Sequence, residues 1–512
     1  MYWLKLNRKK TVGTLLILIL AIPAIHPLLN NGFPLTDDGN WMVIRFSAFY
    51  EALRGGQFPV RFLSRLNNSY GYPVADFLYP LFMYLGVPIH ILGFNFANTV
   101  KIIMGGSIIL SSVFTFYWLK QRFNNLSSLL GALVYVYFPY HLFDLYKRGS
   151  VGELLAMAIA PFIFWQIERK NLALTAFGIG LLILAHNSLA FIFLPVIIFY
   201  IVVAHYNDLK RWLISISLGL GLAAFFWIPA LYDKQFTVFD KVVVSDYAKY
   251  FITPDNVNLY GLLSVVLFLT SLVVLSKKRE KVFSYFFLLL LFVVFLTLSV
   301  SSFIWKLDIL SGFIQFPFRL LSVVCLIGAY LAAFQLNLIK TKFLYLVFAI
   351  YAILIVISSV GFIKPVIQNY PDSFYSTNQD STTVKNEYMP IWVKNLPQVS
   401  PGEKVSVIKG HQSIEGLNIT SNKITFNFYA PSETLIQVNT VYFPGWVVKL
   451  DGKETAINYK DNGLIRFSAL KKGTHTAEVV FRETNLRLIA DFISLASIVI
   501  ILLSLKFFKN EK

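Results

Sequence analysis

Apolar runs long enough to cross a membrane recur along most of the chain. The candidate spans lie at 11–25, 99–119, 127–144, 151–167, 171–186, 188–204, 213–231, 259–276, 283–301, 317–338, 343–362 and 486–505. A helix of about 20 mainly apolar residues crosses the hydrocarbon core of a bilayer. The pattern therefore predicts a mostly α-helical, polytopic membrane protein with about 12 spans.

The pattern changes between residues 363 and 485, where the long apolar runs stop. Polar and apolar residues alternate there in KITFNFYA, TLIQVNTVYF, WVVKLDG, GLIRFSAL and HTAEVVF. Period-two alternation interrupted by turns at Asp451-Gly452 and Lys472-Gly473 predicts an antiparallel β-sheet. The chain thus divides into a transmembrane domain, a β-sandwich domain and a final span with its tail, at 1–362, 363–485 and 486–512.

Lysine and arginine cluster in the short links between the apolar runs. These links are 120–122, 169–170, 210–211, 277–281, 340–342 and the tail 506–512. If the span at 99–119 enters from outside, every link falls in the cytoplasm, as the positive-inside rule expects. Both chain ends are then cytoplasmic, and the β-sandwich domain is extracytoplasmic. The first apolar run lacks a convincing small-x-small cleavage site, so we expect an uncleaved anchor.

The long first loop, residues 30–98, is also predicted outside, and it carries two helical patterns. The stretch 74–93 must begin and end outside, and its prolines favour a broken helix along the membrane surface. Residues 40–55 have an apolar face at helical spacing, opposite a polar stripe, and predict an interfacial helix. Arg45 projects from the apolar face, and its head either reaches the lipid headgroups or points into a cleft beneath the helix. In the second case Arg45 is a further candidate ligand of a donor phosphate.

Composition excludes several classes of protein. With 56% hydrophobic and 14% charged residues, the chain is too apolar for a soluble multidomain protein. Its net charge of +18 lies mainly in the links, and no basic patch with interleaved aromatics indicates a nucleic-acid partner. Cys325 is the single cysteine, which excludes an intrachain disulfide and a cysteine metal cluster. The sequence also lacks a phosphate-binding GxxxxGK(S/T) loop and an HExxH motif.

Polar and charged residues gather at the span ends that are predicted to face outward. Ionisable groups near a membrane are costly, so such clusters are candidates for function. They occur in FPLTDDGNW, DLYKRGSVGELLA, LAHNSLA and QFPFR. The candidate residues are Asp37, Asp38, Arg45, Asp144, Lys147, Arg148, Glu153, His186, Asn187 and Arg319.

An enzyme on the outer face has no supply of nucleotides, so its activated substrate must arrive within the membrane. A lipid-linked sugar meets this condition. Its transfer needs a carboxylate that takes the proton from the attacking hydroxyl. The transition state resembles an oxocarbenium ion, and the departing phosphate favours the bidentate fork of arginine. One carboxylate close to several arginines would supply this chemistry.

Several motifs, taken in order, resemble a group of bacterial membrane proteins. They are DD with ALRGGQFPVRFLSRLNNSYGYPVADFLYPLFMYL, then DLYKRGSVGELLA, LAHN, FPFR, NEYMPIW and YFPGWVVKLDGK. Over residue 30 to the last span, the chain resembles the GT-C glycosyltransferase superfamily, with its closest likeness to the YfhO-like group and to chains labelled 6-pyruvoyl-tetrahydropterin synthase-related membrane proteins. The sequence itself indicates no pterin chemistry. Where related loops often have a histidine a few residues after the acid, this chain has Trp41.

The resemblance implies a hexosyltransferase in the inner membrane of a bacterial cell, with its active site on the extracytoplasmic side. Its donor would be a polyprenyl-phosphate sugar, and its acceptor an envelope glycan or glycolipid. It also implies that an acid in the first loop, Asp37 or Asp38, is the catalytic base. The sequence requires no cofactor, although two close carboxylates are able to bind a divalent cation.

The acidic pair also has simpler interpretations. An aspartate that precedes a helix caps it by accepting backbone N–H bonds. One aspartate suffices for capping, so Asp38, next to the helix, is equally a cap candidate, and Asp37 is the favoured base. Two neighbouring carboxylates can instead share a raised pKa.

The basic candidates have alternatives as well. Arg148 is favoured as a ligand of the donor phosphate, with Glu153 as its orienting partner, and Lys147 is a further phosphate candidate. A loop salt bridge among these three residues is the simpler interpretation. Gly149 and Gly152 bracket a tight turn that would let the backbone approach a phosphate.

Three more candidates lie at predicted helix ends. His186 and Asn187 fit a satisfied helix end better than a site, and we keep them as supporting residues. Arg319 either faces the donor phosphate from a helix N-terminus or extends to the headgroups. The YFPGW segment fits the core of the β-sandwich better than a sugar platform.

Two other functions compete with the glycosyltransferase. A transporter or flippase of lipid-linked sugars would show inverted repeats and interior ionisable residues, which are not visible. A catalytically silent scaffold would bind glycan through its outer domain, and loss of activity on replacing the acidic pair would exclude it.

Overall fold

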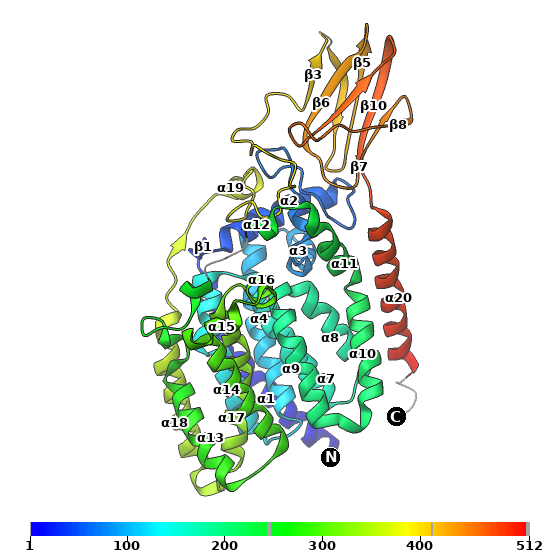
Figure 1. Cartoon of the computed structure of the whole chain (residues 1–512). Helices are drawn as coiled ribbons and strands as arrows, with labels where there is room; N and C mark the ends of the chain where they lie inside the picture. Colours follow the sequence, from blue (N-terminus) through cyan, green and yellow to red (C-terminus); the bar gives the residue numbers. More distant parts are fainter. Residues whose placement is uncertain (1, 243–246, 411–412, 508–512) are drawn as a thin grey trace.

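The computed structural model describes residues 2–242, 247–410 and 413–507. It is a helical bundle with β-sheets at one end, and α1 (Tyr2–Ile25) begins and α20 (Asn485–Phe507) ends at the other (Figure 1). The side chains of 2–11, with the basic flank of the first apolar run, and the tail residues 508–512 lie outside the described part. Helices make up 62% of the structure, which confirms the mostly α-helical class.

A helix lies at the position of each predicted span. Besides α1 and α20, these helices are α4 (Phe96–Leu119), α5 (Asn125–Val136), α6 (Pro139–Phe143), α7 (Val151–Glu168), α8 (Leu172–Ala185), α9 (Asn187–His205), α10 (Leu209–Leu222), α11 (Ala224–Asp233), α13 (Gly261–Lys277), α14 (Lys281–Thr297), α17 (Leu321–Asn337) and α18 (Thr341–Ser359). Among the described residues, seven helices are long and apolar enough to cross a membrane, or up to nine if each bent pair is one span. Because α8 and α13 are shorter, the number of crossings inferred from the sequence stays a prediction.

Two predicted spans are bent. The run predicted over 127–144 turns by 43° between α5 and α6, where Pro139 begins the second helix. Proline lacks a backbone N–H and is tolerated in the first turn of a helix, so the helix restarts there. The other bend, of 83°, follows α14. The remaining short helices are α12 (Phe239–Val242), α15 (Ser302–Trp305), α16 (Asp308–Phe313) and α19 (Asp372–Ser376).

Two helices of the first loop cover the sheet end of the bundle (Figure 1). One of them, α3 (Leu81–Ile91), has 11 residues. At about 1.5 Å per residue it is too short to cross a bilayer, in agreement with the broken helix predicted there. The other, α2 (Gly39–Arg54), packs against α3 closely enough that a Cβ atom at Gly86 would lie 2.6 Å from the ring of Phe46.

A strap formed by residues 363–404 lies over α2. Its strand β2 (Ile367–Gln368) pairs with β1 (Phe33–Pro34). The hydroxyl of Ser47, on the polar stripe of α2, donates to the carbonyl of Tyr375 at 2.7 Å and is buried. Part of the polar stripe is therefore covered by a segment 328 residues away in the chain, whereas Glu51 of the same stripe is exposed, and the interfacial location of α2 stays a prediction.

The C-terminal domain contains two antiparallel sheets, with strand orders β4-β5-β10-β7-β8 and β3-β6-β9. Aromatic rings of Phe426 and Phe467 meet between them. The C-terminal β-sheets are thus confirmed, whereas their extracytoplasmic location stays a prediction. The strands are β3 (Val405–Lys409), β4 (Ile414–Ile419), β5 (Lys423–Ala430), β6 (Thr434–Val441), β7 (Trp446–Leu450), β8 (Lys453–Thr455), β9 (Leu464–Ala469) and β10 (Gly473–Phe481).

The two predicted turns differ in what they connect. Asp451 and Gly452 have φ angles of 51° and 79° and close the hairpin between β7 and β8. The turn at Lys472-Gly473 joins β9 to β10, which belong to different sheets. The local pattern identified both turns, but the choice of partner strand depends on the packing of the whole domain.

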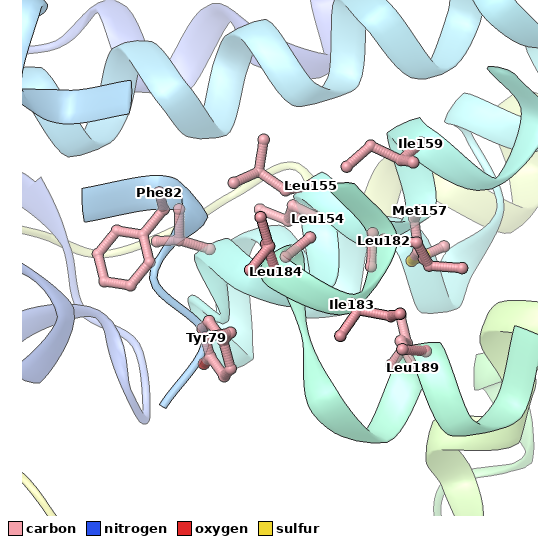
Figure 2. Packing of buried hydrophobic residues seen from close by; sticks show 14 of the residues in the cluster. Tyr79, Phe82, Leu154, Leu155, Met157, Ile159, Leu182, Ile183, Leu184 and Leu189 are labelled. Atoms are coloured by element: carbon pink, nitrogen blue, oxygen red, sulfur yellow. The ribbon is translucent and has the colours of Figure 1, made fainter. Parts of the chain in front are cut away.

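Apolar packing fixes the ends of α7 and α8 beside the first loop. Figure 2 shows Leu154 of α7 and Leu184 of α8 in one apolar cluster with Tyr79 and Phe82. Leu154 and Phe82 are fully buried. Because Leu154 directly follows Glu153, this packing sets the position of that candidate carboxylate.

A second buried feature, a cluster of charges, ties α20 to the first loop and to α11. The Nη2 atom of Arg487 lies 2.8 Å from Asp233 Oδ2 and 3.4 Å from Asp76 Oδ2. Arg61, which is also buried, contacts Asp76 at 3.4 Å and Glu483 at 3.2 Å. Buried charges are stable only when they are paired. These ion pairs therefore anchor the sheet end of α20.

Replacing Arg487 with methionine is expected to destabilise the protein strongly. The change leaves the carboxylates of Asp76 and Asp233 buried with fewer cations, which costs about 3–5 kcal/mol. The matched control is Arg482→Met, because Arg482 pairs with Glu454 at 3.2 Å on the surface and such pairs contribute only about 0–1 kcal/mol. Thermal unfolding of both variants in the same detergent checks this, and equal melting temperatures would contradict it.

Candidate functional site

The acidic pair of the first loop is clamped to the segment that precedes α7. The backbone N–H groups of Asp37 and Asp38 donate to the carbonyls of Lys147 and Arg148 at 2.9 and 2.8 Å. Gly149 permits this close approach, because it has a φ of +67° and a Cβ atom there would lie 2.3 Å from Thr36 Oγ1. Two segments about 110 residues apart in the chain thus form one side of the site.

Glu153, in the first turn of α7, is fully buried and sits among cations and donors. Its Oε1 atom accepts hydrogen bonds from Arg148 Nη1 and, at 2.9 Å, from Arg319 Nε, and it lies 3.7 Å from His186 Nε2. Its Oε2 atom accepts from the hydroxyl of Tyr140 at 3.1 Å. Because both oxygens are committed, Glu153 positions two arginines and is poorly placed to take a proton from a substrate.

Arg148 connects Glu153 to the acidic pair. Its Nη1 atom lies 3.3 Å from Asp144 Oδ1, and its Nη2 atom lies 3.8 Å from Asp38 Oδ2. The guanidinium also lies over the rings of Phe316 and Phe318, at 5.7 and 5.4 Å from their centroids. These cation–π contacts and ion pairs hold the group in one orientation.

Asp38 occupies the N-cap position of α2, but its side chain makes no capping hydrogen bond. The hydroxyl of Thr36 accepts the N–H of Gly39 instead, at 3.0 Å. The Asp38 side chain is 32% exposed, and its nearest cation, on Arg148, is too distant for a hydrogen bond. Its carboxylate therefore keeps free lone pairs, and the capping interpretation does not account for it.

The electrostatic surroundings change the acidity of Asp38. Burial is the largest influence and raises the pKa of Asp38 above the ordinary value, while the positive charge of the neighbouring Arg148 lowers it. The charge of Glu153 raises the pKa further, and those of Arg45 and Arg319 lower it. Asp38 is thus a stronger base than an ordinary aspartate.

Asp37 has a different environment although it is the next residue. Its side chain is 52% exposed, and its Oδ1 atom accepts a hydrogen bond at 2.9 Å from Lys147 Nζ, whose side chain is 64% exposed. This pair is a solvated ion pair at the rim of the site. The structure therefore brings Asp38, and not Asp37, against the buried cluster.

The two arginines for which an extension to the headgroups was considered are both buried. Arg45 donates from Nη2 to the carbonyl of Thr382 at 2.6 Å and from Nε to its hydroxyl at 3.3 Å. Arg319 binds Glu153, the hydroxyl of Ser188 at 3.1 Å and the carbonyl of Ile314 at 2.7 Å. The headgroup interpretation is wrong for both, because protein acceptors satisfy their guanidinium groups.

His186 and Asn187, the two supporting candidates, make different contacts. The Nδ1 atom of His186 accepts the N–H of Leu189 at 3.3 Å and so caps α9, while its ring lies against Tyr79. Asn187 donates to the carbonyl of Phe77 at 2.9 Å, away from the cluster. Of the two, His186 alone contacts Glu153.

Sequence reasoning did not identify every residue of the site. It named Asp144 as a polar residue but assigned it no role, and it missed Tyr140, Phe316 and Phe318. The FPFR motif carried the signal for both phenylalanines, which flank the proline before Arg319. Their contact with Arg148 depends on tertiary packing.

The glycines near the site serve protein packing. A Cβ atom at Gly149 would meet Thr36, and one at Gly152 would lie 2.2 Å from the ring of Tyr79 and 2.5 Å from the carbonyl of Ala185. Protein atoms therefore occupy the space beside the Cα atoms of both glycines, and the approach of a phosphate to this turn stays a prediction. In the YFPGW segment, Trp446 packs between Phe481 of β10 and Phe62 of the first loop, with ring centroids 5.4 Å apart in each pair, so it lies at the junction of the sandwich and the loop.

The donor set for a metal ion is limited. Among the described residues, no group of three or more histidine, cysteine, aspartate or glutamate side chains is arranged to hold one. We therefore derive no chemical step from a metal ion.

Comparison with known proteins gives distant similarities. No family model matches the chain. An uncharacterized protein of Lactococcus lactis subsp. cremoris is 24% identical over 258 residues, which are 46% of this chain and 42% of that protein. This chain thus spans less than half the length of the curated relative that it matches.

Three solved structures are similar to the chain. The arabinofuranosyltransferase AftD from Mycobacteria is 16% identical, covering 70% of this chain and 27% of its own, with a TM-score of 0.49. ArnT from Cupriavidus metallidurans, bound to undecaprenyl phosphate, is 13% identical with coverages of 70% and 67% and a TM-score of 0.46. The oligosaccharyltransferase AglB from Archaeoglobus fulgidus is 12% identical with coverages of 72% and 56% and a TM-score of 0.46. Because each TM-score is below 0.5, we base the proposed function on the side chains of this chain.

Replacing Gly149 with alanine is expected to loosen the clamp on the acidic pair. The positive φ angle and the contact with Thr36 together cost about 1–3 kcal/mol. The control is Gly402→Ala in the strap, where a Cβ atom meets nothing within 4 Å. Thermal unfolding and limited proteolysis of the first loop measure the difference. A Gly149→Ala variant as stable and protease-resistant as the control would show that the clamp is not needed.

Proposed function

We propose that this protein is a membrane glycosyltransferase that moves a monosaccharide from a polyprenyl-phosphate donor to an extracytoplasmic glycan or glycolipid. The observation that carries the proposal is the carboxylate of Asp38, which is partly exposed and uncommitted at the edge of a buried arginine cluster. The resemblance of its motifs to GT-C enzymes supports the same class, in a bacterial inner membrane.

Asp38 is the proposed general base. An acceptor hydroxyl attacks the anomeric carbon of the donor sugar and passes its proton to the Asp38 carboxylate. A new C–O bond forms while the bond between the anomeric carbon and the phosphate oxygen breaks, and the electron pair leaves with the phosphate. A base contributes about 10²–10⁴-fold to such a step.

Arg148 and Lys147 are the proposed ligands of the donor phosphate. Arg148 is the cation nearest to Asp38, and Lys147 carries an exposed ammonium group beside Asp37. Among the described residues, Arg148 forms an ion pair with Asp38 and Arg319 and Arg45 do not, so we assign the latter two positioning roles. Arg319 holds Glu153, and Arg45 holds the strap.

Asp38→Asn is expected to abolish sugar transfer, while Asp37→Asn retains most of it. Each change keeps the shape of the side chain and removes a carboxylate, so the two variants control for each other. The assay offers purified protein in lipid a panel of polyprenyl-phosphate hexoses with cell-wall polymer as acceptor. Equal transfer by both variants and the parent protein would exclude Asp38 as the base.

The rate of transfer is expected to fall on acidification at a higher pH than an ordinary aspartate would give. The base must be deprotonated, and the raised pKa of Asp38 means that it gains its proton above about pH 4. A profile of kcat/KM against pH for the parent and for Asp37→Asn measures this acidic limb, which should be the same in both. A limb at or below the range of an ordinary aspartate would contradict the assignment.

A further inference from the structure

A polar cavity lies between the first loop and the strap, and its lining includes none of the residues of the carboxylate cluster. Its volume is about 570 Å³, within the usual range of roughly 300–1,000 Å³ for pockets that hold small ligands. Asn67, Asn68, Asn378 and Gln379 are among the lining residues. Amide and hydroxyl groups therefore dominate its walls.

The lining has free hydrogen-bonding capacity. Within the described residues, no hydrogen bond uses the side-chain nitrogen of Asn378 or of Gln379, although Asn378 Oδ1 accepts the N–H of Asp380 at 2.9 Å and Gln379 Oε1 accepts from Ser400. The side chain of Asn386 likewise has no hydrogen-bond partner there. Several amide donors are thus available to a ligand in the cavity.

The lining carries little charge, and this restricts the chemical class of ligand that the cavity can bind. Asp380 is the one ionisable residue in it, and its Oδ1 atom already accepts the N–H of Thr382 at 2.8 Å. A phosphate or another anion would require cations, and a lipid chain would require more apolar surface than Leu396 and Pro397 supply. Neutral hydroxyl groups require neither cations nor an apolar surface, and they form hydrogen bonds with amide donors and acceptors.

The cavity walls are tied together. Asn68 donates from its backbone to the carbonyl of Gln379 at 3.0 Å and from its side chain to the carbonyl of Pro397 at 2.9 Å. Its φ of 52° lies in the left-handed region, as do those of Asn67 and Ser69. Such backbone conformations persist only where the surrounding structure enforces them. The cavity is therefore built into the junction of the first loop and the strap.

One arginine connects the cavity with the carboxylate cluster. Ser381 lines the cavity, and the next residue, Thr382, receives two hydrogen bonds from Arg45. The charge of Arg45 is in turn among those that act on Asp38. The strap thus forms a wall of the cavity and reaches α2 behind the proposed base.

We propose that this cavity binds the acceptor of the reaction, and that the acceptor is a neutral oligosaccharide. This assignment rests on the proposed function, since an acceptor exists only if the protein transfers a sugar. Its recognition groups are the side-chain amides of Asn378, Gln379 and Asn386.

The test is direct binding, measured by saturation-transfer NMR on the full chain in lipid nanodiscs without donor. The probes are trisaccharides of glucose, of N-acetylglucosamine and of galacturonic acid. We expect the parent to bind at least one of the two neutral probes and to reject the anionic one. Removal of both amides in N378A/Q379A should weaken binding about 10-fold or more.

A second cavity variant and a matched control separate loss of the site from loss of the fold. Gln398→Trp adds bulk at an exposed position of the lining and should block the cavity while leaving the Asn378 region intact. Asn418→Ala removes a matched exposed amide on β4, away from the cavity, and should bind as the parent does.

The outcomes distinguish the cavity from the proposed chemistry. Binding that is lost in both cavity variants, with a raised acceptor KM and a nearly unchanged kcat, supports the assignment. Failure of the parent to bind either neutral probe, or equal binding by the parent and both cavity variants, overturns it, even if Asp38→Asn abolishes transfer. Binding by a parent protein that transfers no sugar from any donor would overturn the acceptor role.

Discussion

The arrangement of the site depends on the ion pairs that the buried carboxylate of Glu153 forms with two arginines. It accepts hydrogen bonds from Arg148 and Arg319, which come from different parts of the chain, and it lies close to His186. Removal of this one carboxylate would leave two buried guanidinium groups without their shared partner, and that is far more costly than the loss of a surface ion pair. The cluster thus fixes how the start of α7, the start of α17 and the end of α8 meet.

Asp37 and Asp38 show how neighbouring residues acquire different chemistry. The same short loop places one carboxylate in water against a lysine and the other at the edge of the buried cluster. Burial raises the pKa of Asp38. The hydroxyl of Thr36, and not the Asp38 carboxylate, accepts the N–H of Gly39 at the start of α2. A carboxylate with a raised pKa takes up a proton more readily than an ordinary aspartate does.

The strap gives the site its second layer. It leaves the bundle after α18, pairs with the chain before the acidic loop, and covers α2 before entering the sandwich (Figure 1). Arg45 is buried beneath it and bonded to Thr382. Through the strap, the β-domain is connected to the helix that follows the proposed base, so that the proposed acceptor cavity and the carboxylate cluster share structural elements.

The sequence by itself determined the helices, the C-terminal strands and the segments that carry the site. Apolar runs and period-two alternation are local properties, and the few charges in an apolar chain stand out for the same reason. The sequence favoured Asp37 as the base because one aspartate beside the helix suffices as a cap, whereas the structure leaves Asp38 uncapped at the edge of the buried cluster. The sequence also contains no sign that Phe316 and Phe318 face Arg148. It also held no sign that Ser47 of α2 is covered by the strap, which is 328 residues away. These outcomes depend on contacts between distant segments, and only the tertiary structure decides which carboxylate stays free and which is buried among cations.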